Sequence, residues 1–151
     1  AYLLFIPRLR KVFLTNRRKF IRNFFIIQAG FFLLGLVLFL SVYFSGKWII
    51  SLLLPDTFAP SGDLLQLMSI VALIKSINFG FGAFLVAVEW QKNRLIPQFI
   101  ASVLALILNL IILPKFGLPG AAYIFIINEV VLLLGYAGFV LKWLTINRAS
   151  F

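Results

Sequence analysis

The sequence predicts an all-α, polytopic transmembrane helical bundle with four full spans. Of the 151 residues, 63% are hydrophobic and only 12% are charged, whereas soluble domains are close to half apolar and a quarter charged. A soluble fold of this length has too much surface to hide so many apolar side chains. The apolar residues form long continuous runs, which in lipid are expected to be helices, because a helix pairs its own backbone polar groups.

Four apolar stretches are each long enough to cross the bilayer. They cover about residues 24–44, 64–88, 95–113 and 120–141. About 20 residues of helix are needed to span a hydrocarbon core of ~30 Å. A basic segment, 8–23, precedes the first stretch, and the apolar residues 1–7 are expected to end an earlier transmembrane helix. Residues 24–151 are therefore the predicted four-helix transmembrane region, which we expect to belong to a larger protein.

The predicted connections differ in length. Residues 45–63 form a longer loop, although its apolar part, 48–54, either lies in the membrane interface or extends the first helix. The turn 114–119 is tight, and we expect Pro114 to stop one helix and Pro119 to precede the next. So short a turn makes the third and fourth helices antiparallel neighbours.

The distribution of Lys and Arg predicts the orientation of the chain. Counted in order along the chain, these residues number seven in segment 8–23, one in loop 45–63, two in loop 89–94, one in turn 114–119 and two in the tail after Leu141. Cytoplasmic loops carry the excess of positive charge in membrane proteins. The alternation therefore predicts a multi-pass membrane protein with segment 8–23, loop 89–94 and the C-terminus in the cytoplasm.

The composition excludes several functional classes. The chain has neither cysteine nor histidine, so disulfides, Zn-thiolate sites, thiol catalysis and histidine chemistry are ruled out, and its four acidic residues leave few candidates for a metal or acid/base site. We therefore predict no catalytic residues, no metal site, no cofactor and no enzymatic activity. The basic segment 8–23 has lipid on both sides, so we expect it to contact lipid headgroups rather than a nucleic acid.

Lys75 lies near the middle of the second predicted span. A lysine at that depth costs ~2.5–3.5 kcal/mol on insertion scales and should face a polar cavity or a partner. On a helix it shares a face with Met68, Asn78 and Gly82. Lys75 and Asn78 are therefore candidate cavity-lining residues that would bind an anionic substrate. The alternative is that Lys75 pairs with an acid on a neighbouring helix and serves assembly only.

Glu129 lies near the middle of the fourth predicted span, next to Asn128. It is a candidate either for coupling transport to a proton or ion, or for pairing with Lys75, and the sequence does not decide between them. Gln28, Gln98 and Asn109 are amides in the other spans. A lone amide in a span is usually explained by a hydrogen bond between helices.

Four parts of the sequence resemble a known family. They are the helix exit Phe5-Ile6-Pro7-Arg8-Leu9, the segment Leu54–Pro60 followed by Leu64–Met68, the hairpin Leu108–Ala122 containing Pro-Lys-Phe-Gly-Leu-Pro-Gly-Ala-Ala, and the Asn-Glu pair at 128 and 129. Together they resemble the C-terminal part of the polysaccharide flippases, which translocate O-antigen or capsule repeat units. These flippases belong to the multidrug/oligosaccharidyl-lipid/polysaccharide exporter superfamily.

The resemblance implies a fold, a function and partners. The chain would be part of one lobe of a transporter of the multidrug-exporter fold, and an N-terminal half of the same transporter would complete it. The implied function is translocation of undecaprenyl-pyrophosphate-linked oligosaccharide across the plasma membrane, with polysaccharide polymerase and glycosyltransferases as further partners. A drug/cation antiporter, a peptidoglycan-precursor flippase and a non-transporting membrane subunit remain open as alternatives.

Overall fold

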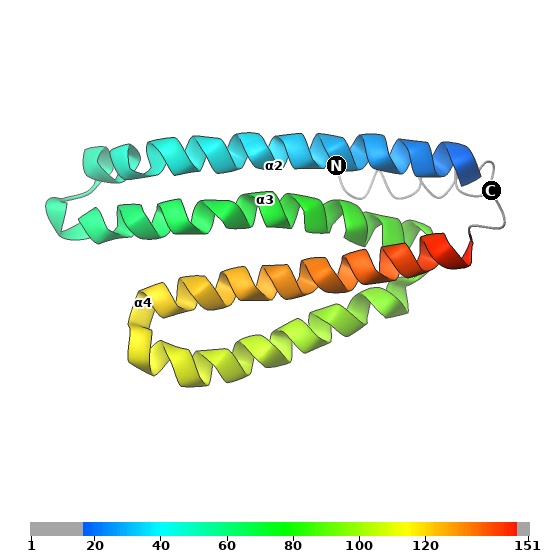
Figure 1. Cartoon of the computed structure of the whole chain (residues 1–151). Coiled ribbons are helices and arrows are strands. Elements are labelled where there is room, and N and C mark those ends of the chain that lie inside the picture. The colour runs from blue at the N-terminus through cyan, green and yellow to red at the C-terminus, as the bar shows by residue number, and fades with distance from the viewer. Residues whose placement is uncertain (1–16, 148–151) are drawn as a thin grey trace.

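The computed structural model describes residues 17–147, and its main elements are three long helices (Figure 1). Helix α2 covers Arg17–Leu53, α3 covers Ala59–Ala87 and α4 covers Gln91–Ile146, and a short 3-10 helix, η1, covers Asp56–Phe58. Each of the three long helices is long and apolar enough to cross a membrane. The described chain is therefore all-α and a candidate multi-pass membrane protein.

Helix α4 folds back on itself at Gly117 (Figure 1). Gly117 has φ 55° and ψ −139°, a backbone conformation that glycine adopts more readily than any other residue. It separates a first arm, 91–116, from a second arm, 118–146. The arms pack closely, because a β-carbon placed on Gly135 would lie 2.5 Å from the Cβ of Pro97. The described chain thus has three long apolar helices, not the four spans predicted, since the third and fourth predicted spans share one element.

The turn of α4 is tighter than the turn predicted to cover residues 114–119. Pro114 and Pro119 both lie within the bounds of α4, and Gly117 is the residue with non-helical dihedral angles. The prediction that Pro114 stops the helix was therefore wrong. The reversal needs a residue with positive φ, which glycine supplies, and Pro119 then falls in the first turn of the second arm, where its missing N–H is not needed.

The helices also extend further than hydropathy indicates. Residues 17–23 of the predicted basic loop form the first turns of α2, because Arg and Lys are good helix formers whose charged ends reach the interface. Most of the predicted loop 45–63 is helical too, so the stretch 48–53 extends the first helix. The chain leaves the helix near Pro55. Residues 1–16 and 148–151, including the predicted helix end at 1–7, lie outside the described residues.

Helix α3 is the central element of the bundle. It packs against both α2 and α4, and Figure 1 shows it between α2 and the second arm of α4. In its most apolar stretch half of the residues are buried, against 6% in α2 and 11% in α4. The outer faces of α2 and α4 are therefore rich in exposed Leu, Ile and Phe side chains, as expected for lipid contact.

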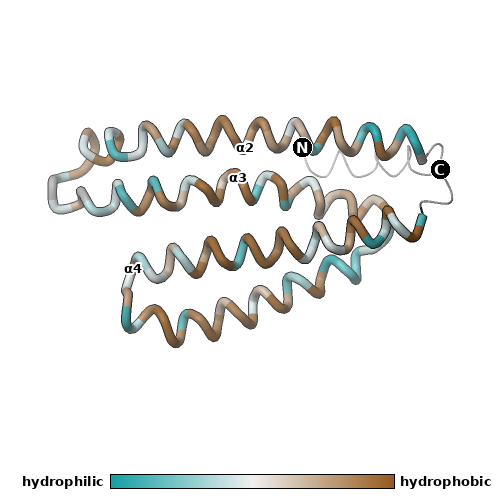
Figure 2. The backbone as a smooth tube through the Cα atoms, viewed as in Figure 1, coloured by the Kyte–Doolittle hydropathy of each residue, from teal (hydrophilic) through white to brown (hydrophobic). Residues whose placement is uncertain are grey.

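The most polar helix ends gather at one end of the bundle. The start of α2, the connection between α3 and α4 and the end of α4 lie together there (Figure 1), and the start of α2 and the start of α4 are hydrophilic (Figure 2). The connection is short, and Glu89 within it has a φ of 65°. The reversal at Gly117 and the connection between α2 and α3 lie at the opposite end. This arrangement agrees with the alternation of charge along the sequence, while the orientation in the membrane stays a prediction.

Small residues bring α2 and α3 close together. A β-carbon on Gly35 would lie 2.7 Å from the Cβ of Ser76, and one on Gly80 would collide with the side chain of Gln28. The Gln28 amide donates a hydrogen bond to the backbone carbonyl of Ile77 at 3.3 Å. Close backbone approach and an amide bond between helices are the usual means of packing helices in lipid.

An aromatic cluster joins all three long helices at the end where α4 finishes. Phe20 and Phe24 come from α2, Phe84 from α3 and Trp143 from α4, and all four are almost fully buried. The Phe84 ring centroid lies 4.6 Å from that of Phe24 and 5.1 Å from that of Trp143. Tilted and edge-on ring pairs at these distances add about 0.5–1.5 kcal/mol each to the burial. This cluster fixes α3 relative to α4 and thereby positions the polar residues farther along the two helices.

Candidate functional site

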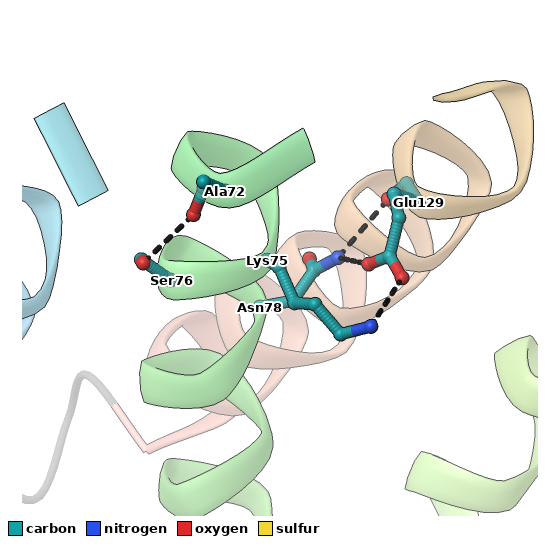
Figure 3. A network of polar contacts seen from close by, with 5 residues as sticks. All are labelled: Ala72, Lys75, Ser76, Asn78 and Glu129. Carbon is teal, nitrogen blue, oxygen red and sulfur yellow. Dashed lines mark hydrogen bonds and ion pairs between the residues drawn. The ribbon is translucent and has the colours of Figure 1, made fainter. Parts of the chain in front are cut away.

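Lys75 and Glu129 meet between α3 and the second arm of α4. The Lys75 ammonium lies 3.5 Å from Oε1 of Glu129, as Figure 3 shows. Residues 125, 129, 132 and 136 recur every three or four positions, so they share the face of the second arm that packs on α3. The structure therefore brings together the two charged residues that the sequence places near the middle of two separate spans.

Asn78 completes the contacts of the Glu129 carboxylate. Its amide nitrogen donates to Oε2 of Glu129 at 3.0 Å and to the backbone carbonyl of the same residue at 3.1 Å (Figure 3). Asn78 lies one turn after Lys75, so both reach the same partner. We refer to Lys75, Asn78 and Glu129 as the Lys75 cluster. The Oδ1 atom of Asn78 is buried and accepts no hydrogen bond in the described part of the chain.

The two charges of the cluster differ in exposure. The Glu129 side chain is 6% exposed, whereas that of Lys75 is 50% exposed. The Lys75 ammonium also lies 5.2 Å from the centroid of the Phe125 ring, one turn before Glu129, at a distance where a cation is attracted to the ring face. Lys75 therefore has a fixed, buried counter-ion on one side and open space on the other.

That open space is a pocket of about 140 Å³ beside the cluster. It is lined by Lys75, Asn78, Phe79, Gly82, Arg94, Glu129, Leu132 and Tyr136. The Arg94 side chain lies against Gly82, where a β-carbon would be in ordinary van der Waals contact with Nε of Arg94 at 3.5 Å. The pocket thus contains two cationic side chains and one carboxylate, which suits a ligand that carries negative charge.

Arg94 and Tyr136 are the lining residues that sequence reasoning missed. In the sequence, Arg94 contributed only to the count of positive charges that predicts the orientation of loop 89–94. In the structure, its side chain extends back between α3 and α4 and lines the pocket. Tyr136 lies seven residues after Glu129 and is 4% exposed. That spacing, two helical turns, is the signal that could have placed it on the face of Glu129.

The remaining amides behave differently from one another. Gln28 makes the predicted bond between helices. The Asn109 amide instead donates to the carbonyl of Ala105 in its own arm, at 2.7 Å. Gln98 lines a separate hollow near the start of α4. Within residues 17–147, no group of three His, Cys, Asp or Glu residues lies close enough to hold a metal ion.

The cluster is a balanced charge arrangement at membrane depth. Lys75 stands about 18 Å from the end of α3, at 1.5 Å per residue, which places it near the middle of a span. A single buried charge at that depth is costly, and an opposite charge with further hydrogen bonds offsets the cost.

Comparison of the chain with known proteins found no match among protein families, curated proteins or solved structures.

Proposed function

We propose that this chain is the C-terminal part of a transporter that moves undecaprenyl-pyrophosphate-linked oligosaccharide across the plasma membrane. Two things support the proposal: the resemblance of the hairpin around Pro114 to the polysaccharide flippases, and the charged pocket between apolar helices. In this reading both arms of α4 cross the bilayer, which makes four crossings in residues 17–147. The basic end of the bundle faces the cytoplasm.

The observation that carries the proposal is the unequal exposure of the ion pair. An ion pair that serves assembly alone needs no pocket beside either of its charges. Here Glu129 is buried and Lys75 is half exposed beside a pocket. Its ammonium can therefore turn to the pyrophosphate or to sugar hydroxyls while Asn78 continues to satisfy the Glu129 carboxylate.

A second function is supported by the same ion pair. In a non-transporting membrane subunit, Lys75 and Glu129 would hold α3 to α4 and the pocket would have no substrate. The 3.5 Å contact favours this reading as much as it favours transport. The drug/cation antiporter and the peptidoglycan-precursor flippase are related transporters, and a pocket with two cations and one acid favours an anionic substrate over a cationic drug.

A charge exchange separates transport from assembly. Lys75→Ala in the full-length transporter should lower the amount of protein in the membrane, and it should also reduce the surface glycan exported per transporter molecule in cells that depend on it. The double variant Lys75→Glu/Glu129→Lys keeps an ion pair but moves the ammonium to the buried position. We expect it to restore membrane protein levels without restoring export.

Lys142→Ala, which removes an exposed lysine at the end of α4, is the matched control and should export normally. Wild-type export by the exchanged double variant would show that any ion pair suffices, and the assembly function would then replace the transport role of Lys75.

A further inference from the structure

A second hollow lies between the end of α3 and the start of α4. Its volume is about 260 Å³, and its lining residues are Val86, Gln91, Arg94, Leu95 and Gln98. Positions 91, 94 and 98 are three and four residues apart, so their polar side chains lie on one face of the first arm. The hollow thus combines one guanidinium and two amides with apolar neighbours.

Arg94 is held at this seam rather than extended into solvent. It is half-buried, and it lines both this hollow and the pocket beside the Lys75 cluster. A guanidinium presents several N–H donors in one plane, a geometry that fits phosphate oxygens. In the described chain, the side chains of Gln91 and Gln98 make no hydrogen bond to another residue, so both amides remain able to donate.

The depth of the hollow matches that of lipid phosphates. Val86 follows Lys75 by eleven residues of α3, which is about 16 Å along the helix axis. Half of a ~30 Å hydrocarbon core is about 15 Å. With the Lys75 cluster near the middle of the membrane, Val86 and the start of α4 therefore stand near the boundary between hydrocarbon and headgroups, and the Arg94 side chain reaches inward from there to Gly82.

The surface around the hollow fits an anionic phospholipid. Arg22 near the start of α2 and Lys142 near the end of α4 are exposed, and these helix ends lie at the same end of the bundle as the hollow, where Glu89 is exposed too. Leading away from the hollow along the first arm, Leu95 and Phe99 are 61% and 72% exposed. These apolar side chains offer a surface for an acyl chain directly below the polar groups.

We propose that this hollow binds the phosphate headgroup of an anionic membrane phospholipid. Arg94 is the principal cation, Gln91 and Gln98 donate to the phosphate oxygens, and the exposed apolar face of the first arm contacts an acyl chain. The lipid rather than free phosphate is the occupant, because the apolar surface continues from the polar groups. Arg94 also lines the pocket beside the Lys75 cluster, whereas Gln98 lines this hollow and not that pocket, so a change at Gln98 tests the lipid site separately from the proposed function.

The experiment compares two charge-neutralising variants only two residues apart. The intact chain is purified from membranes with equal phosphatidylglycerol and phosphatidylcholine, and the retained lipids are counted by native mass spectrometry. The wild-type chain should retain phosphatidylglycerol preferentially. Arg94→Gln should lower that preference about tenfold, as expected for loss of one charge-assisted hydrogen bond. Lys92→Gln, which removes an exposed charge outside the hollow, should leave it unchanged.

Three results would overturn the proposal. These are equal retention of the two lipids by the wild-type chain, equal losses in the Arg94→Gln and Lys92→Gln variants, and displacement of the lipid by inorganic phosphate alone. Circular dichroism must show unchanged helicity in each variant. If Arg94→Gln does not fold, Gln98→Leu decides, because it keeps every charge and removes one donor. A normal lipid preference in Gln98→Leu would then count against the site.

Discussion

The ammonium of Lys75 and the carboxylate of Glu129 lie 3.5 Å apart, although the whole first arm of α4 separates them along the chain. Asn78 holds the other oxygen of the same carboxylate. The pair therefore links the central helix to the last arm of the bundle, and its two partners should respond differently to removal.

Removing the cation should destabilise the protein more than removing the anion. Lys75→Met leaves a buried carboxylate without its counter-ion, which we expect to cost about 3 kcal/mol. Glu129→Gln leaves a half-exposed ammonium that can reach polar surroundings, and we expect a cost of about 1 kcal/mol. Unfolding of the purified protein in mixed detergent micelles measures both free energies.

The double variant Lys75→Met/Glu129→Gln completes a thermodynamic cycle. Because each single change already breaks the ion pair, the double variant should lose less stability than the sum of the two single variants, by about 1 kcal/mol or more. Additive losses would mean that the 3.5 Å contact contributes nothing to the stability of the fold.

Close packing at Gly35 provides a second prediction. Gly35→Val places side-chain atoms against Ser76 of α3, so α2 must shift outward, at a cost of about 1–3 kcal/mol. Gly30→Val is the matched control in the same helix, because nothing lies within 4 Å of a β-carbon there. The difference between the two variants in detergent unfolding isolates the packing effect from helix propensity. Similar stabilities would show that α2 and α3 are not held together at this point.

The sequence indicated which charged and amide residues lie inside the apolar runs, and it was less informative about where the helices end. Lys75, Asn78 and Glu129 stood out because charged and amide groups are costly inside an apolar run. Helix ends were misplaced because hydropathy reports where lipid ends, whereas a helix continues into the interface as long as its backbone bonds remain favourable. The chain reverses at Gly117, within α4, and not at Pro114 where a helix end was predicted.

The sequence also did not place Arg94 and Tyr136 beside the site, and the reason is a different one. The place of Arg94 beside Gly82 depends on the angle at which α4 leaves α3, and no local pattern encodes that angle. Helical spacing links Tyr136 to Glu129, but only the packing of the second arm on α3 turns that shared face toward the pocket.

The aromatic cluster should contribute more to stability than its position near the end of the bundle indicates. Phe84 is fully buried against Phe20, Phe24 and Trp143, so Phe84→Ala leaves a cavity that we expect to cost about 3 kcal/mol. Phe99→Ala is the control, since Phe99 is 72% exposed on the first arm. Thermal unfolding followed by tryptophan fluorescence compares them. Equal melting temperatures for the two variants would contradict the role assigned to the cluster.

The topology can be tested by cysteine labelling because residues 1–151 contain no cysteine. Single cysteines replacing Thr57 and Lys115 should be labelled from outside intact cells by a membrane-impermeant thiol reagent. Cysteines replacing Lys92 and Thr145 should react only after the membrane is opened. All four positions are exposed in the structure. Labelling of the Lys115 and Lys92 positions from the same side would mean that the first arm of α4 does not cross the bilayer.

The pairing of Lys75 with Glu129 also has a consequence for biosynthesis. The ribosome makes Asn78 and its neighbour Lys75 first, and Glu129 follows Asn78 by 51 residues, a delay of a few seconds at about 5–20 residues per second. During that interval α3 holds a lysine whose counter-ion has not been made. Stable integration of α3 should therefore wait for the second arm of α4, so a chain truncated between Gly117 and Glu129 should be cleared by membrane proteases faster than the intact protein.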